Sequence, residues 1–283
     1  MTRSVPTRRM SFEESLRDVP RHFAQDGDLL GSHLTAALSS AFPDGEDFFV
    51  RSVRHFRSEI TDPTFKEQVA GFIGQESVHG REHRAFNDRL AELGYPTKLY
   101  ERIVFRVLAF RSKVAPAKAN LAATAALEHF TAVLAEHILT SEQTRDRLGH
   151  PAVRDLFVWH ALEESEHKAV AFDVYRAVGG TERMRIWTMK AIRVGFILAA
   201  TAAVAGSLAG DSATYRPGAL RTSWKRFKAS PMISKDMWAA LKEYDRPGFH
   251  PDDRDTDELL EHWRAELFGP DGSLNNLLAG AAA

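Results

Sequence analysis

Apolar residues along this chain recur, in one segment after another, at the spacing of an amphipathic helix. Phe49, Val53 and Phe56, for example, would fall on one face of a helix. That helix is expected to begin near Asp44, a good N-cap. No run alternates apolar and polar positions as a half-buried strand does. The pattern predicts an all-α protein with helices over about 28–40, 44–56, 62–93, 98–113, 117–140 and 151–177.

Capping and helix-breaking residues indicate where the longer helices begin and end. Asp62 is a good N-cap, and Pro63 suits the first position of the long third helix. Gly94 and Pro96 would end that helix. From such boundaries we expect three regions: a flexible basic arm at 1–27, a helical bundle at 28–180, and additional C-terminal helices at 181–283 that pack on the bundle as part of the same domain.

The segment 194–210 has 17 residues without a charge. It is slightly shorter than the roughly 20 residues of an ordinary membrane span. It is rich in Ala and Gly, and Lys190, Arg193 and Asp211 lie close to its ends. We expect a buried helix, or a helix at the subunit interface of a homodimer, where small residues allow close packing. A helix that touches a membrane is the alternative.

The composition is that of a globular protein, with 283 residues, 44% of them hydrophobic, and a net charge of −1. A nearly neutral chain lacks the basic surface of a nucleic-acid-binding protein. There is no cysteine, so any metal must be held by nitrogen and oxygen ligands. The N-terminal segment contains Arg3, Arg8 and Arg9 but no apolar run long enough for a secretory signal. We therefore expect a cytoplasmic protein.

Two segments place acidic and imidazole side chains on one face of a helix. Because a helix advances by about 100° per residue, His160, Glu164 and His167 lie within an arc of roughly 60°. Glu76 and His79 share a face of the third helix in the same way, and His83 follows one turn later. Such a face can bind a metal ion.

Di-iron and di-manganese carboxylate bundles combine a lone Glu on each of two helices with Glu-x-x-His on each of two others. The chain supplies these residues in alternation, and His160 adds a further imidazole. Mixed nitrogen and oxygen ligands suit iron or manganese. We assign the first three candidate ligands to one ion and the last four to the other. In chain order they are Glu46, Glu76, His79, Glu128, His160, Glu164 and His167.

Some of these residues also have a simpler interpretation. A single Glu-x-x-His motif is often a coincidence on a helix surface, and His160 could be a core histidine bonded to a backbone carbonyl. His83, Glu163 and Asp173 are further candidates, either as ligands or as groups that orient a ligand. Six other histidines belong to no visible constellation: His22, His33, His55, His137, His150 and His250.

Five of the seven candidate ligands lie in three specific phrases, at 42–49 (FPDGEDFF), 75–87 and 163–175. These phrases resemble the bacterial family known as predicted metal-dependent hydrolases. The resemblance extends over about 30–255 and implies a ferritin-like four-helix bundle with additional C-terminal helices. The His-x-x-x-Glu-x-x-His pattern at 160–167 is also similar to that of di-iron arylamine N-oxygenases, which implies oxygen activation at a histidine-rich di-iron centre.

We therefore favour a non-haem di-iron monooxygenase that uses dioxygen to hydroxylate or oxygenate a hydrophobic small molecule. Two iron ions would be the cofactors, with manganese as the alternative metal. An external reductase or ferredoxin would supply electrons, because the chain has no nucleotide-binding glycine motif. A dinuclear metal-dependent hydrolase is the first alternative, and an iron-storage protein is the second. Four apolar residues suggest a hydrophobic substrate cavity, although such positions are more often plain core: Phe72, Phe86, Phe130 and Trp159.

Overall fold

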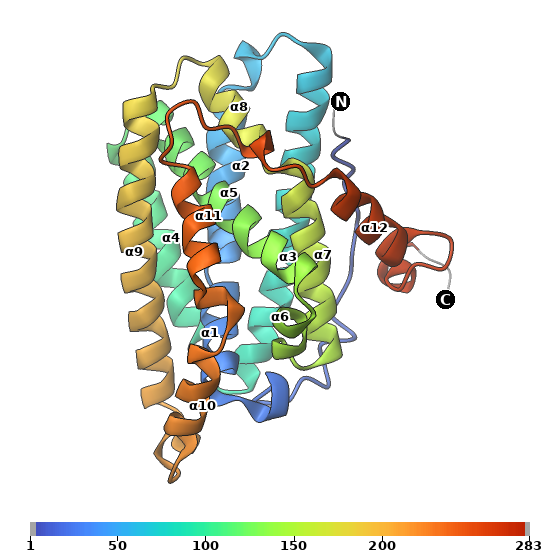
Figure 1. The fold of residues 1–283 in the computed structure, drawn as a ribbon, viewed down its shortest axis with the longest axis vertical. Coiled ribbons are helices and arrows are strands. Elements are labelled where there is room, and N and C mark those ends of the chain that lie inside the picture. The colour runs from blue at the N-terminus through green and yellow to red at the C-terminus, as the bar shows by residue number, and fades with distance from the viewer. Residues whose placement is uncertain (1–3, 281–283) are drawn as a thin grey trace.

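Helices make up the regular structure of residues 4–280, which are the part of the chain that the computed structural model describes (Figure 1). No β-strand occurs among these residues, where an isolated β-bridge joins Met10 to Leu278. The all-α prediction is confirmed. The helices are α1 (Leu29–Ser39), α2 (Phe42–His55), α3 (Pro63–Glu92), α4 (Thr97–Val114), α5 (Ala117–Thr140), α6 (Glu142–Arg147), α7 (Pro151–His167), α8 (Val170–Ala177), α9 (Glu182–Ala209), α10 (Ala219–Lys228), α11 (Lys235–Glu243) and α12 (Asp257–Phe268).

Four helices, α2, α3, α5 and α7, form the centre of the molecule (Figure 1). α2 packs along α3, α5 packs along α7, and the two pairs contact each other. Phe72 and Phe130 belong to one buried apolar cluster, and Phe86 and Trp159 belong to another. The sequence left two interpretations of these four aromatic residues, a cavity lining or plain core. They are core residues, because the helices pack directly against them.

The ends of these helices follow local sequence rules. The Asp62 carboxylate accepts a hydrogen bond from the backbone N–H of Phe65 and thereby caps α3, as predicted. α2 begins at Phe42, two residues before the predicted cap at Asp44. The reason is that proline is compatible with the first turn of a helix, so Pro43 does not interrupt α2.

The described N-terminal residues do not form the free arm that the basic composition suggested. The segment runs beside α3 and α7 (Figure 1), where Phe12 packs against Trp159 and Phe23 packs against Phe86. The backbone N–H of Phe12 also donates a hydrogen bond to Glu82. Burial of these aromatic side chains stabilises the segment on the bundle.

The C-terminal third covers the bundle from two sides. α9 and α11 pack on α5, and α12 packs on α7. Residues 194–210 are not buried within the chain, because α9 lies at the edge of the molecule (Figure 1), and the subunit-interface alternative stays a prediction. Between residues 194 and 209 only Val204 and Ser207 are buried. One face of α9 contacts α5, and its other apolar residues face outward.

Candidate metal centre

All seven candidate ligands predicted from the sequence meet inside the central bundle. α2 contributes Glu46, α3 contributes two residues, α5 contributes Glu128 and α7 contributes three. Each of these residues is at most 4% exposed. The Glu-x-x-His spacing explains the local arrangement, because residues three apart lie on the same side of a helix. The bundle then turns these sides of its helices toward one another.

The first group of candidate ligands consists of Glu46, His79 and His160, each of which offers an atom within 4.8 Å of the others. His160 Nε2 lies 3.6 Å from Glu46 Oε1. The two imidazole rings are stacked at a tilt, with centroids 4.1 Å apart. Three helices therefore supply one carboxylate and two imidazoles to this group.

The second group consists of Glu76, Glu128 and His167, again within 4.8 Å of one another. His167 Nε2 lies 3.0 Å from Glu76 Oε1 and 3.4 Å from Glu128 Oε2. Neither contact has hydrogen-bond geometry. The three side chains instead face a common point from α3, α5 and α7.

Glu164 lies between the two groups. Its Oε1 is 2.9 Å from His160 Nε2 in the first group, and its Oε2 is 3.6 Å from His167 Nε2 in the second. Thr131 of α5 donates a hydrogen bond of 2.5 Å to Oε2. A carboxylate in this position can contact two cations at once.

This grouping differs from the assignment in chain order, which placed His160 with Glu128 and His167, and Glu76 with Glu46. A helix rises by about 1.5 Å per residue, so His160 and His167 are separated by roughly 10 Å along α7. The structure therefore pairs His160 with α2 and the first part of the site, and His167 with α5.

A cation fits the centre because its buried polar atoms have no other partners. Within residues 4–280, eight of them lack a hydrogen bond: both carboxylate oxygens of Glu46, Glu76 and Glu128, together with His79 Nδ1 and His167 Nε2. Burial, and then the neighbouring Glu128 carboxylate, raise the pKa of Glu76 to about 8. Burial and Glu164 likewise raise the pKa of Glu128 to about 7. A positive ion would relieve both effects, and oxygen and imidazole ligands suit divalent first-row metals.

Glu163 orients His79 and is not a member of either group. Its Oε2 lies 2.9 Å from His79 Nε2, so that His79 Nδ1 faces the centre. Its Oε1 accepts a hydrogen bond of 2.9 Å from Arg8 in the N-terminal segment. A carboxylate behind a histidine fixes the ring and increases its basicity.

A second hydrogen-bond network holds His167. Its Nδ1 lies 2.8 Å from the amide oxygen of Gln75, whose nitrogen donates to Glu166. Glu166 accepts two hydrogen bonds from Arg8 and one from Arg264 of α12. The sequence analysis missed these four residues. The available signal was three glutamates within the single turn 163–166, next to the mostly apolar segment 156–162, which require cations from elsewhere in the chain.

His83 supports His160 from the side away from the centre. Its Nε2 lies 2.7 Å from His160 Nδ1, and its Nδ1 lies 2.9 Å from the Ser39 hydroxyl. Ser39 in turn donates to Asn87. Because both nitrogens of His83 have partners in the protein, His83 belongs with the supporting residues.

Replacing His83 by Ala is expected to weaken metal binding about 10–100-fold, because His160 would lose the contact that orients its ring. His83→Gln, which can still form a hydrogen bond, should recover part of the affinity. Isothermal titration of zinc into metal-free protein measures the change. His262→Ala, at an exposed position of α12, is the control. Unchanged affinity in His83→Ala would show that His160 is oriented by other contacts.

Asp173, the third further candidate, lies away from the centre. Its carboxylate is 2.8 Å from His250 Nε2, and its side chain is 39% exposed. α7 ends at His167 and a new helix, α8, carries Asp173. The expectation that Asp173 orients a ligand assumed one continuous helix, and the break between α7 and α8 removes that geometry.

An apolar cavity of about 170 Å³ reaches the centre between α1, α5, α7 and α10. Leu34, Leu134 and Phe157 are among its wall residues, and His160 and Glu164 also line it. The Arg226 side chain of α10, 36% exposed, forms part of the outer wall. The cavity therefore connects the buried ligands with the surface beside α10.

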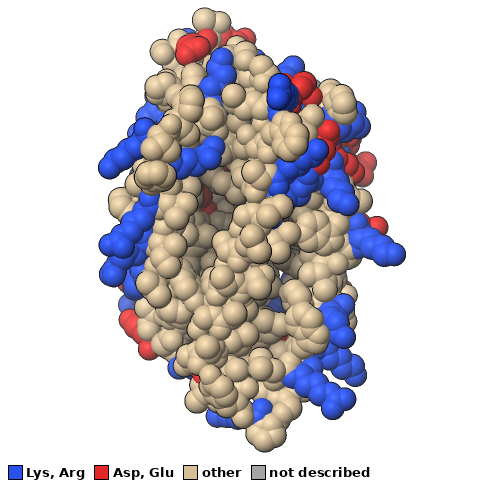
Figure 2. Space-filling model, turned by 90° about the vertical axis from the view of Figure 1, so that its left-hand side faces the viewer, with Lys and Arg blue, Asp and Glu red and all other residues tan. Residues whose placement is uncertain are grey.

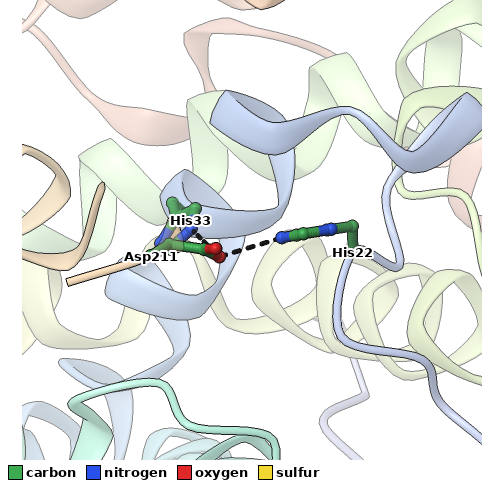
Figure 3. A group of neighbouring side chains, drawn as sticks. All are labelled: His22, His33 and Asp211. Atoms are coloured by element: carbon green, nitrogen blue, oxygen red, sulfur yellow. Dashed lines mark hydrogen bonds and ion pairs between the residues drawn. The ribbon is translucent and has the colours of Figure 1, made fainter. Parts of the chain in front are cut away.

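Two histidines that the sequence analysis left unassigned, His22 and His33, meet at Asp211 (Figure 3). Asp211 Oδ2 lies 2.9 Å from His22 Nε2 and 3.1 Å from His33 Nε2, and it also accepts a hydrogen bond from Arg21. Its Oδ1 accepts from the backbone N–H of Ala213. In contrast to Glu46, Glu76 and Glu128, both oxygens have protein partners. The cluster therefore joins the N-terminal segment and α1 to the end of α9.

Asp211→Asn is expected to lower the free energy of unfolding by about 1.5–3 kcal/mol at neutral pH, the range for hydrogen bonds to a charged group. Burial would raise the pKa of Asp211, but hydrogen bonds from His22 and Ala213 outweigh it and hold the pKa well below its usual value. The carboxylate thus stabilises the fold above its unfolded pKa of about 4, and this contribution is lost as the pH falls. The difference between the proteins should shrink in acid.

Urea unfolding over a series of pH values measures this difference. Asp18→Asn, at an exposed position, is the control. A difference that stays constant down to strongly acidic pH would contradict the charged role of Asp211.

The comparison with protein families decides between the enzyme hypotheses. Residues 6–255 match the family described as predicted metal-dependent hydrolase. The chain belongs to this family. No curated protein and no solved structure matches the chain. The metal-dependent hydrolase resemblance is confirmed, whereas the ferritin-like relationship stays a prediction.

Membership of the metal-dependent hydrolase family contradicts the di-iron monooxygenase hypothesis and supports the hydrolase alternative. The family description implies an enzyme that depends on a metal, and the buried groups are candidate sites for it. Dioxygen and a reductase or ferredoxin were expected only for an oxygenase. The physical reason for the error is that carboxylate and imidazole ligands hold redox-active and redox-inert cations alike, so a ligand pattern does not specify the reaction.

Proposed function

We propose that this protein is a dinuclear metal-dependent hydrolase that acts on a small molecule with an apolar part. The observation that carries the proposal is the convergence of eight buried nitrogen and oxygen atoms without protein hydrogen-bond partners. Such a cluster requires compensation by a cation. The family description supports the same class of reaction.

The ligand set suits two divalent first-row cations. The first group would hold one ion and the second group the other, and Glu164 would contact both. When bound, such ions lower the pKa of a water molecule and polarise the bond to be cleaved. Carboxylates from four helices would balance their charge.

Residues of the chain would position the substrate and hold the protons around the centre. The apolar walls, including Leu134 and Phe157, bind the apolar part of a substrate and exclude bulk water. The Thr131 hydroxyl donates its proton to Glu164 Oε2 and fixes that carboxylate. His83 and His160 share one proton between Nε2 and Nδ1, which leaves Nε2 of His160 directed at the centre.

The proposal is tested on the full-length protein after a chelator has removed bound metal. The protein is then reconstituted with zinc or manganese and supplied with nitrophenyl esters of increasing acyl length and with nitrophenyl phosphate. We expect two ions per chain, hydrolysis that requires the metal, and a rate that does not change when oxygen is removed.

Binding of fewer than two ions, or hydrolysis that persists without metal, contradicts the proposal. Oxygen consumption with iron oxidation and no hydrolysis product indicates iron storage instead. Faster hydrolysis of longer acyl esters would agree with the apolar cavity, whereas a preference for nitrophenyl phosphate would argue against an apolar substrate.

A further inference from the structure

One side of the molecule, formed by α4, α9 and the region of α10, exposes an unusual number of large apolar side chains. Figure 2 shows this side of the molecule. Residues without a charged side chain dominate its middle, and Lys and Arg lie mainly along the edges. Among the described residues, every large apolar side chain that is strongly exposed lies between 99 and 114 or between 187 and 224. We call this surface the α4/α9 face.

α4 contributes a continuous apolar row. Leu99, Ile103, Val107, Phe110 and Val114 lie within an arc of about 80° on this helix. They are between 49% and 66% exposed. A helix of a soluble protein normally buries such a row against the protein core. Here the row faces solvent.

α9 adds the second apolar row. It is long and apolar enough to cross a membrane, yet only 6% of its most apolar 18-residue stretch is buried in the protein. Trp187, Val194 and Leu198 are each at least 60% exposed. The opposite side of α9 packs along α5 of the bundle. A helix fixed to a globular body along its length does not span a bilayer, but it can lie in the plane of its surface.

The charge of the three helices identifies the partner. α4, α9 and α10 together contain 13 Lys and Arg, of which nine are exposed, and two Glu, neither of which is exposed, whereas the whole chain has 37 basic and 38 acidic residues. The exposed Arg102, Arg106 and Lys113 lie beside the apolar row of α4. A second copy of the chain bound through the same face would oppose its own basic rim. An anionic lipid surface would instead complement it.

We propose that the α4/α9 face binds the surface of an anionic lipid bilayer, with the apolar rows of α4 and α9 in the boundary between head groups and acyl chains. Exposed Trp187 and Trp224 suit the head-group level, where aromatic rings are favoured. The exposed basic residues then contact acidic head groups. This docking is independent of the enzymatic reaction.

The apolar cavity relates the face to the centre. α10 carries Leu220 and Trp224 of the exposed surface and also Arg226 and Phe227 of the cavity wall. A bilayer against this face would lie beside the entrance to the cavity, so an apolar substrate would enter directly from the lipid. This last step alone rests on the proposed hydrolase function.

Co-sedimentation with lipid vesicles tests the docking without any assay of activity. The full-length protein is mixed with vesicles of phosphatidylcholine alone and of phosphatidylcholine with phosphatidylglycerol. We expect binding to the anionic vesicles that weakens as salt is added. Phe110→Glu with Leu198→Glu removes apolar contact, and Arg102→Glu with Arg106→Glu reverses charge. The charge-reversal pair should reduce binding more than about tenfold, because each basic residue near a membrane contributes about fivefold. The apolar pair should reduce binding to a similar extent, because it loses apolar contact and adds two negative charges.

Lys66→Glu, an exposed position on α3, should bind like the unaltered protein. Circular dichroism and metal content of the variants, which lie outside the metal centre, should not change. Failure to bind anionic vesicles, or equal binding by all variants, overturns the proposal. So does a dimer in sedimentation analysis that Phe110→Glu dissociates and that does not bind vesicles, because the face would then be a subunit interface.

Discussion

Replacing Glu76 by Gln is expected to reduce bound metal from two ions per chain to one or none, and to lower hydrolysis by more than about 100-fold. Glu76 faces both groups, with Oε1 3.0 Å from His167 Nε2 and 3.8 Å from His79 Nδ1. Loss of a residue that only supports a metal ligand already lowers metal affinity or activity about 10–100-fold. Metal analysis and ester hydrolysis measure the two effects.

The same substitution is expected to stabilise the metal-free protein. Burial raises the pKa of Glu76 from its ordinary 4.5 to about 8 in the folded protein. The ionised carboxylate therefore destabilises the folded state relative to the unfolded chain. Stability is therefore lost as the pH rises from 4.5 through 8. The neutral amide of Gln avoids this loss. In chelator at alkaline pH the variant should have the higher Tm, and with saturating metal it should have the lower one.

Glu67→Gln is the matched control, because Glu67 is an exposed residue of the same helix. It should change neither metal content nor Tm. Two tightly bound ions in Glu76→Gln would show that Glu76 is not a metal ligand. A lower Tm of this variant than of the unaltered protein in chelator would show that the site does not need a cation.

Replacing Arg8 by Ala is expected to lower the free energy of unfolding by about 3–5 kcal/mol, the cost of leaving buried charges without their partner. The Arg8 guanidinium donates two hydrogen bonds of 2.8 Å to Glu166 and one of 2.9 Å to Glu163. Both carboxylates are at most 2% exposed. Arg264 would still compensate Glu166, but among the described cations none other is bonded to Glu163. Urea unfolding measures the loss.

Metal affinity should fall in Arg8→Ala as well, because Glu163 orients His79 and Glu166 holds the Gln75 that contacts His167. Arg8→Lys should restore only part of the stability, since an ammonium group lacks the planar fork of the guanidinium. Arg9→Ala, an exposed neighbour, is the control. If Arg8→Ala were no less stable than Arg9→Ala, the N-terminal segment would have no role in holding the centre.

Much of the fold could be predicted, because its rules are local. The limits of α5 and the cap of α3 by Asp62 follow from neighbouring residues. The Glu-x-x-His motifs place their side chains on one face by helical geometry alone. Two such faces, alternating along the chain with a lone Glu on each of two other helices, also predicted which residues would meet in the interior, although their role as ligands awaits the metal experiments.

The supporting contacts could not be predicted in the same way. Arg8 meets Glu163 across 155 positions of the chain, and His22 meets Asp211 across 189. No local pattern marks such pairs, because their separation depends on which helices become neighbours. The exposure of α9 was missed for a related reason: an apolar sequence predicts that a helix avoids water, but not whether protein or lipid covers it.

The amino-acid sequence by itself determined the all-α class, the family, and the seven acidic and imidazole residues that meet at the centre, since each of these depends on residue types and spacing along one helix. The tertiary structure decided how those residues divide into two groups, which distant arginines balance the surplus charge, and which apolar rows stay uncovered. These properties arise only when separate helices pack together, because they are distances between elements and not periods within them.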